Sequence, residues 1–153
     1  MEKYTLYVIH CMSENFEYLP HTADIIVHAW GDDMRAAFVN GAIGMFAYMT
    51  DLSKVDEIDH KLVSGEFEDG ATDEGKLFTF LDELLFFFST EDYFICKRIE
   101  FRQLDSDGFQ VVVYGEPMSL RKHTQGTEIK AITYHGMTVN HTDRVDVSFL
   151  LDI

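Results

Sequence analysis

Hydrophobic and polar residues are arranged along the chain in runs that predict alternating strands and helices. Residues 24–30 are rich in β-branched side chains and stop at Gly31 and Asp32, a pattern typical of a strand. Asp32 or Asp33 suits the N-cap of a helix that ends near Thr50. One face of this helix collects apolar and small residues at helical spacing, namely Met34, Phe38, Gly41, Ala42, Met45, Tyr48 and Met49.

The middle of the chain repeats the order of strand and helix. Residues 61–67 alternate with a period of two and predict a strand. A second amphipathic helix is expected to start at Thr72 or Asp73, and its apolar face comprises Leu77, Leu81, Leu84, Leu85 and Phe88. Residues 94–103 and 109–115 follow as two strands, and the Asp107-Gly108 pair between them indicates a hairpin.

The last part of the chain is predicted to be β-structure after a loop. Residues 116–126 form the loop, and strands are expected at residues 127–134, 137–140 and 144–151. Helices that lie between runs of strands indicate the α+β class, with a mostly antiparallel β-sheet and two amphipathic helices packed on one face. The 153 residues suit a single domain, 1–153, in which residues 1–15 are an additional N-terminal segment of unknown role.

Charge and composition narrow the classes of partner. The formal net charge is −15, from 27 acidic against 12 basic side chains, so the field around the protein repels a phosphate backbone. Direct RNA binding by a basic surface is therefore not expected. The charge suits a basic partner protein or divalent cations, although an acidic surface is also a common means of remaining soluble.

Cysteine use and hydropathy bear on the compartment. Cys11 and Cys96 form no CxxC pair and have no histidine at zinc spacing, which argues against a disulfide scaffold or zinc finger. No apolar stretch reaches 18 residues, so no membrane partner is expected. We expect a cytoplasmic protein and leave a nuclear pool open.

Two acidic positions stand out as candidate metal ligands. Asp24 opens the first predicted strand directly after His21-Thr22-Ala23, and Asp152 precedes the terminal carboxylate of Ile153. Hard oxygen donors from these three groups would suit Ca²⁺ or Mg²⁺ if the fold brings them together. Alternatively, Asp24 caps a local turn with His21 exposed, and Asp152 points to solvent. No motif for nucleotide binding or for α/β-hydrolase chemistry occurs.

Several separated segments together resemble the archease family. They are residues 17–24 (EYLPHTAD), 29–31 (AWG), 126–135 (GTEIKAITYH) and 151–153 (LDI), in the same order and spacing, so the resemblance spans residues 16–153. It implies an accessory protein, not an enzyme, that activates the RtcB-type RNA ligase in tRNA splicing. Such an activator promotes guanylation of the ligase and multiple turnover, and meets tRNA only through the ligase.

The resemblance also assigns residues. It implies a metal site at Asp24, Asp152 and Ile153, and the family's metal is usually described as calcium. Lys130 matches a family lysine near that site and would pair with a carboxylate, contact the ligase or contact its guanylate phosphate. His21 is an accessory candidate. The resemblance does not indicate an oligomeric state.

Two other functions remain open from the sequence. In a metal-dependent hydrolase, Asp24 and Asp152 would activate water on a bound cation, and His21 would transfer the proton. In a general chaperone-like protein, the run Phe86-Phe87-Phe88 would form an apolar contact patch, although such a run is also typical of a core.

Overall fold

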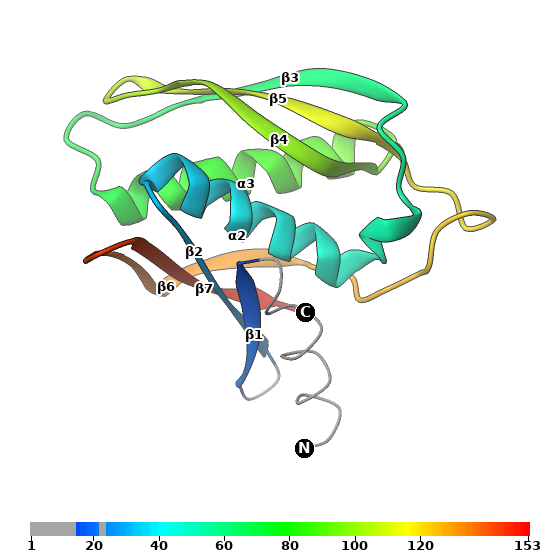
Figure 1. Ribbon diagram of the computed structural model, residues 1–153, viewed down its shortest axis with the longest axis horizontal. Coiled ribbons are helices and arrows are strands. Elements are labelled where there is room, and N and C mark those ends of the chain that lie inside the picture. Colours follow the sequence, from blue (N-terminus) through cyan, green and yellow to red (C-terminus); the bar gives the residue numbers. More distant parts are fainter. Residues whose placement is uncertain (1–14, 22–23) are drawn as a thin grey trace.

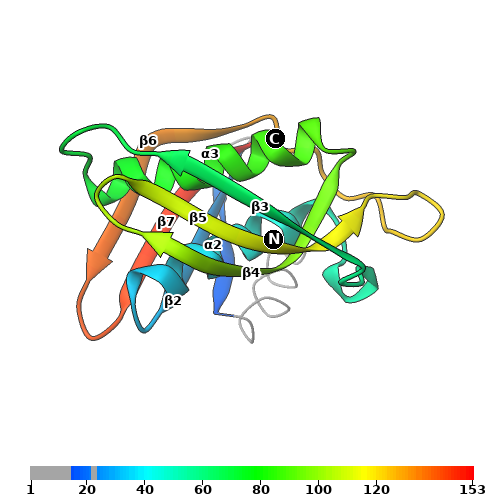
Figure 2. The same cartoon turned by 90° about the horizontal axis from the view of Figure 1, so that it is seen from above.

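The computed structural model describes residues 15–21 and 24–153, in which two antiparallel sheets enclose two helices (Figure 1). The first sheet consists of β1 (Phe16–His21), β2 (Asp24–Gly31), β6 (Ala131–His141) and β7 (Val145–Asp152), in the order β1-β2-β7-β6. The second sheet consists of β3 (Asp59–Glu66), β4 (Phe94–Leu104) and β5 (Gly108–Pro117), in the order β3-β5-β4. The helices are α2 (Met34–Met49) and α3 (Asp73–Thr90), with a short 3₁₀ helix, η1, at Leu52–Lys54. Seen from above, the second sheet lies over both helices (Figure 2).

The α+β class and the antiparallel pairing are confirmed, whereas the expected single sheet is replaced by two sheets. Each sheet still carries the helices on one face only, as predicted (Figure 1). Alternation of apolar residues identifies a strand but not its partner, and β2 pairs with β7, more than 100 residues later. The division into two sheets was therefore not accessible from local pattern.

The helix boundaries follow from their caps, as the sequence predicts. The Asp33 carboxylate accepts a hydrogen bond from Ala36 N at 2.8 Å at the start of α2, and Thr50 ends this helix. At α3 the Thr72 hydroxyl accepts a hydrogen bond from Gly75 N at 3.1 Å. No helix within the described residues has the length and apolar character needed to cross a membrane.

Helix α2 is buried on several sides because it lies between the sheets. Gly44 lets it approach the first sheet closely, since a Cβ there would come within 3.1 Å of Phe16 and of Val27. More of this helix is buried than the single apolar face that was expected. The buried residues also include Ala37, Gly44 and Phe46.

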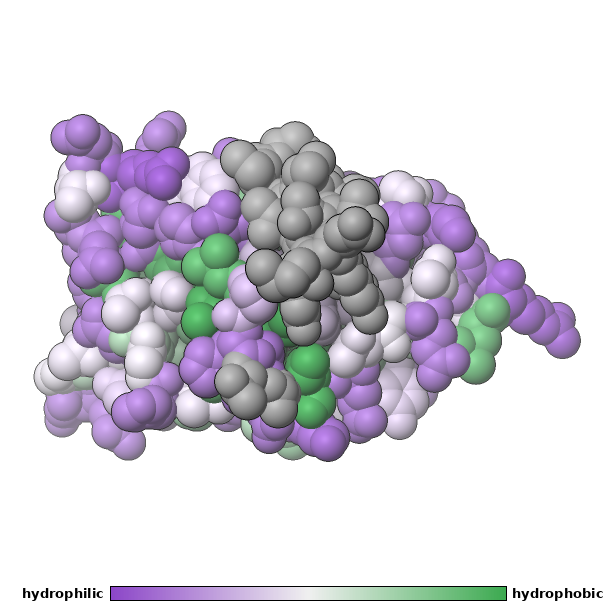
Figure 3. Space-filling model, turned by 90° about the horizontal axis from the view of Figure 1, so that it is seen from below, coloured by the Kyte–Doolittle hydropathy of each residue, from purple (hydrophilic) through white to green (hydrophobic). Residues whose placement is uncertain are grey.

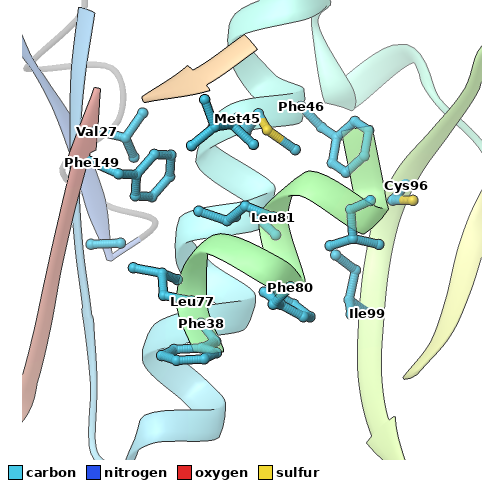
Figure 4. Packing of buried hydrophobic residues seen from close by; sticks show 14 of the residues in the cluster. Val27, Phe38, Met45, Phe46, Leu77, Phe80, Leu81, Cys96, Ile99 and Phe149 are labelled. Carbon is cyan, nitrogen blue, oxygen red and sulfur yellow. The ribbon is translucent and has the colours of Figure 1, made fainter. Parts of the chain in front are cut away.

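One hydrophobic core joins the two sheets through the helices (Figure 4). Val27 and Phe149 project from the first sheet, Met45 and Leu81 from the helices, and Cys96 from β4 (Figure 4). The Cys96 side chain is fully buried in this core and acts as a packing residue, and its burial raises the pKa of the thiol.

Two local predictions needed correction. Residues 16–21, for which no strand was predicted, form an edge strand, β1. Residues 127–130 are not β-structure, and the strands expected at 127–134 and 137–140 are one strand, β6, with an irregularity between Thr133 and Thr138. Gly136, with φ of +77°, lies in that irregularity. The proposed segment 1–15 lies outside the described residues except for Asn15, as do Thr22 and Ala23.

Candidate carboxylate site at the end of the first sheet

A single row of residues crosses the first sheet at the end where β7 finishes. His21 on β1 lies opposite Asp24 on β2, Asp24 lies opposite Asp152 on β7, and Asp152 lies opposite Ala131 on β6. Directly opposed residues of antiparallel strands project to the same side of the sheet. The structure thus brings together Asp24 and Asp152, which are 128 positions apart in the sequence.

The two carboxylates lie on the outer face of the sheet, away from the helices. Their neighbours Ile25 and Leu151 are buried in the core, and successive strand residues point to opposite faces. The Asp24 side chain is 24% exposed, and Asp152 is exposed. Seen from below, the visible part of this side of the molecule is largely hydrophilic, with a limited hydrophobic area near its middle (Figure 3).

His21 lies beside Asp24 without a hydrogen bond between them. Its Nδ1 is 3.9 Å from Asp24 Oδ2, which is beyond hydrogen-bonding distance. The imidazole is 53% exposed, so even its protonated form would pair only weakly with the carboxylate. His21 is therefore free to turn toward a ligand on this face.

The carboxylate oxygens of Asp24 and Asp152 are suitable ligands for a hard cation, but the protein supplies few of them. Within residues 15–21 and 24–153, no three His, Cys, Asp or Glu side chains are grouped so as to hold a metal. Asp24 and Asp152 would need a main-chain oxygen of Ile153, whose side chain packs against the core. Oxygen donors suit Ca²⁺ or Mg²⁺, and Ca²⁺ takes 6–8 of them, so water or another molecule would have to complete the shell.

Lys130 reaches the row through its main chain. Its N–H donates a hydrogen bond of 2.8 Å to the carbonyl of Asp152, one residue before β6 begins. Lys130 is exposed and lines a groove together with Leu85, Phe86 and Ser89 of α3. The structure thus places Lys130 beside both the carboxylate row and α3.

Farther along the same outer face, where β2 pairs with Ser148 of β7, a histidine joins three strands. His28 Nδ1 is 3.1 Å from Glu17 Oε1 on β1, and its Nε2 is 2.7 Å from Asp146 Oδ2 on β7. Burial alone would raise the pKa of Asp146, but hydrogen bonds from Arg144 and His28 outweigh it and lower that pKa. His28 therefore has a structural role on this face.

A buried cluster fixes the connection between β5 and β6, which leads to Lys130. Glu116 Oε2 accepts hydrogen bonds from Lys122 Nζ at 2.6 Å and from Asp56 N at 2.7 Å, and lies 3.3 Å from His123 Nε2. The buried His123 ring accepts a hydrogen bond of 2.8 Å from Ser119 N at its Nδ1. We call these residues the Glu116 cluster, and it fastens residues 118–123 to the body of the protein.

Glu116→Gln is expected to lower the free energy of unfolding at pH 7 by about 1–3 kcal/mol, because buried partners lose a charged acceptor. Burial alone raises the pKa of Glu116, but Lys122 and Asp56 N hold it below its usual 4.5. A depressed pKa stabilises the folded state above about pH 4.5, and this contribution disappears as the pH falls through the folded-state value. The free energies of unfolding of wild type and Glu116→Gln are measured in urea at pH 7 and at pH 3.5 to 4. The difference between wild type and variant should shrink at the lower pH, and an equal difference at both pH values would contradict the assignment.

Comparisons with known proteins agree with this architecture. The family model described as the Archease protein family (MTH1598/TM1083) matches residues 16–153. A zebrafish (Danio rerio) protein named archease is 39% identical over 144 residues, 93% of this chain and 87% of the relative. A Drosophila melanogaster archease-like protein is 46% identical over 129 residues, 81% of this chain and 79% of the relative.

A solved structure shows the same fold. The solution structure of Methanobacterium thermoautotrophicum protein 1598 superposes with a TM-score of 0.74 at 28% identity. The match covers 92% of this chain and 99% of that one. The resemblance noted from the sequence is confirmed over nearly the whole chain, and the protein belongs to the archease family.

Proposed function

We propose that this protein is an accessory activator of an RtcB-type RNA ligase in tRNA splicing, promoting guanylation of the ligase and multiple turnover. The observation that carries the proposal is the family match over residues 16–153. The candidate site supports it, since the Asp24 and Asp152 carboxylates lie on an outward sheet face that a second macromolecule can approach. Activation by contact needs such an accessible group.

In the proposed activator, Asp24, Asp152 and a main-chain oxygen of Ile153 hold a divalent cation, for which calcium is our choice. The cation would neutralise part of the local negative charge and offer a positive centre to oxygen groups of the partner. His21 would contact the partner next to this cation, and Lys130 would contact it from the side of α3.

The partner is a protein, and tRNA is reached only through it. With a net charge of −15, this chain repels RNA but attracts a basic surface of an RNA-binding ligase. Complex formation should therefore weaken as the salt concentration rises. A cytoplasmic location, with a nuclear pool, fits such a role.

The test is multiple-turnover ligation of RNA ends by a cognate RtcB-type ligase with GTP and Mn²⁺, with and without this protein. We expect several turnovers per ligase in its presence and stalling near one turnover in its absence. Well-folded protein that leaves the turnover number unchanged would contradict the proposal. Hydrolysis of phosphate esters by the isolated protein, lost in Asp24→Asn, would favour the hydrolase instead.

A further inference from the structure

An open groove runs along the C-terminal half of α3, on the side of the molecule where Lys130 lies. Its larger part has a volume of about 680 Å³ and is lined mainly by apolar side chains, among them Met49, Leu85, Phe88, Tyr93, Leu120 and Ile129. A smaller part of about 400 Å³ adjoins it and adds Asp82, Glu83 and Phe86. Leu85, Ser89 and Lys130 line both parts, so the two form one continuous groove, which we call the α3 groove.

Exposed apolar side chains gather around the α3 groove. Leu120 is 71% exposed, Phe86 63% and Tyr93 58%, and these are three of the seven large hydrophobic residues that are exposed within the described part of the chain. A concave apolar surface with a polar rim is typical of a protein interaction site rather than of ordinary surface.

The wall that carries Leu120 is held in place before any partner binds. Leu120 lies between Ser119 and His123, which are hydrogen-bonded to each other within the Glu116 cluster. A wall fixed in advance lowers the entropy lost on binding. The opposite wall is the rigid helix α3, so the α3 groove is largely preformed.

The charges around the α3 groove favour a positively charged ligand. Three acidic residues, Asp82, Glu83 and Glu128, line the groove. Within the described residues, Lys130 is the one basic residue that lines it. A second copy of the chain, also at −15, or a nucleic acid would be repelled, whereas a basic segment of a protein would be attracted.

We propose that the α3 groove docks a basic segment of the partner protein that inserts an apolar side chain between Leu120 and α3. The identity of the partner rests on the proposed function. The groove also connects to the carboxylate row, because Lys130 lines it and donates its N–H to the Asp152 carbonyl. The groove along α3 and the carboxylates on the outer face of the first sheet are thus linked through Lys130.

The experiment measures the affinity of the ligase and the stimulation at saturation as separate quantities. Leu120→Asp and Phe86→Asp are expected to raise the Kd about tenfold or more, because apolar anchors dominate such interfaces, and to keep stimulation once saturated. Ile58→Asp and Leu62→Asp are matched controls, since these residues are equally exposed, at 71% and 63%, and line neither part of the groove. They should change the Kd less than about threefold.

The outcomes separate the two proposals. Groove variants that bind the ligase as tightly as wild type overturn the docking inference and leave the activator function intact. A wild type that binds but does not stimulate overturns the activator function alone. If the wild type does not bind the ligase, a 12-residue Lys/Leu peptide and its Glu/Leu counterpart serve as probes in an NMR titration. Shifts at Leu85, Leu120 and Ile129 with the Lys/Leu peptide only would support the groove, and their absence would overturn it.

Discussion

Asp24→Asn is expected to reduce the stimulation of ligation about tenfold or more while leaving the fold intact. The substitution keeps the size of the side chain but removes the charge that faces Asp152 across β2 and β7. Loss of a group that only supports a metal ligand already costs about 10–100-fold in metal affinity, so loss of a ligand itself should cost at least as much. Multiple-turnover ligation measures the stimulation, and calorimetric titration of the isolated protein with Ca²⁺ measures the metal affinity.

Asp143→Asn is the matched control for this prediction. Asp143 is exposed in the turn between β6 and β7, at the opposite end of β7 from Asp152. The same loss of one negative charge there should leave both stimulation and Ca²⁺ binding unchanged. Equal losses in the two variants would mean that net charge, and not the carboxylate row, controls activation. Weak Ca²⁺ binding that Asp24→Asn does not alter would remove Asp24 from the metal site.

Phe80→Ala is expected to lower the free energy of unfolding by about 3–5 kcal/mol, the range for removing a fully buried phenyl ring. Phe80 is fully buried on α3 and faces the second sheet. Its ring stacks on Phe101 and meets Phe109 edge-on, both at 5.2 Å between ring centroids, and Phe38 lies 5.7 Å away. These contacts join α3, α2 and two strands, so the cavity left by alanine cannot collapse easily. Urea unfolding followed by circular dichroism gives the difference.

Phe86→Ala on the same helix provides the comparison for Phe80→Ala. Phe86 is 63% exposed, so the same truncation there removes little buried area and should cost less than about 1 kcal/mol. A similar loss of stability for both variants would mean that the arrangement of α3 between the sheets is not the one described.

Features set by neighbouring residues could be predicted from the sequence. Each N-cap was narrowed to two adjacent residues, of which the structure selects Asp33 and Thr72, because capping depends on a side chain and a backbone N–H within three or four residues. The hairpin of β4 and β5 was found from its Asp-Gly turn for the same reason. The metal site was inferred from its acidic residues and from the family resemblance, and the ligase partner from the resemblance, and both remain predictions.

Features set by distant pairing could not be predicted from local pattern. Strand β1 was overlooked because Pro20 and His21 are poor strand residues, and an edge strand tolerates both. Asp24 and Asp152 were proposed as neighbours, but only the pairing of β2 with β7 places them in one row with His21. Lys130 was expected near that row, and its N–H does bond to the Asp152 carbonyl, but its place in the groove beside α3 could not be predicted from local pattern.

The pairing of β2 with β7 also has a consequence for biosynthesis. The β4–β5 hairpin can form as soon as residues up to Pro117 have left the ribosome, because its contacts are close in sequence. Residues 24–31 must instead wait for residues 145–152. The ribosome releases the chain from its N-terminus, so β2 waits without its β7 neighbour while more than 100 further residues are added. The carboxylate row is thus assembled late in synthesis, and incomplete chains would lack it.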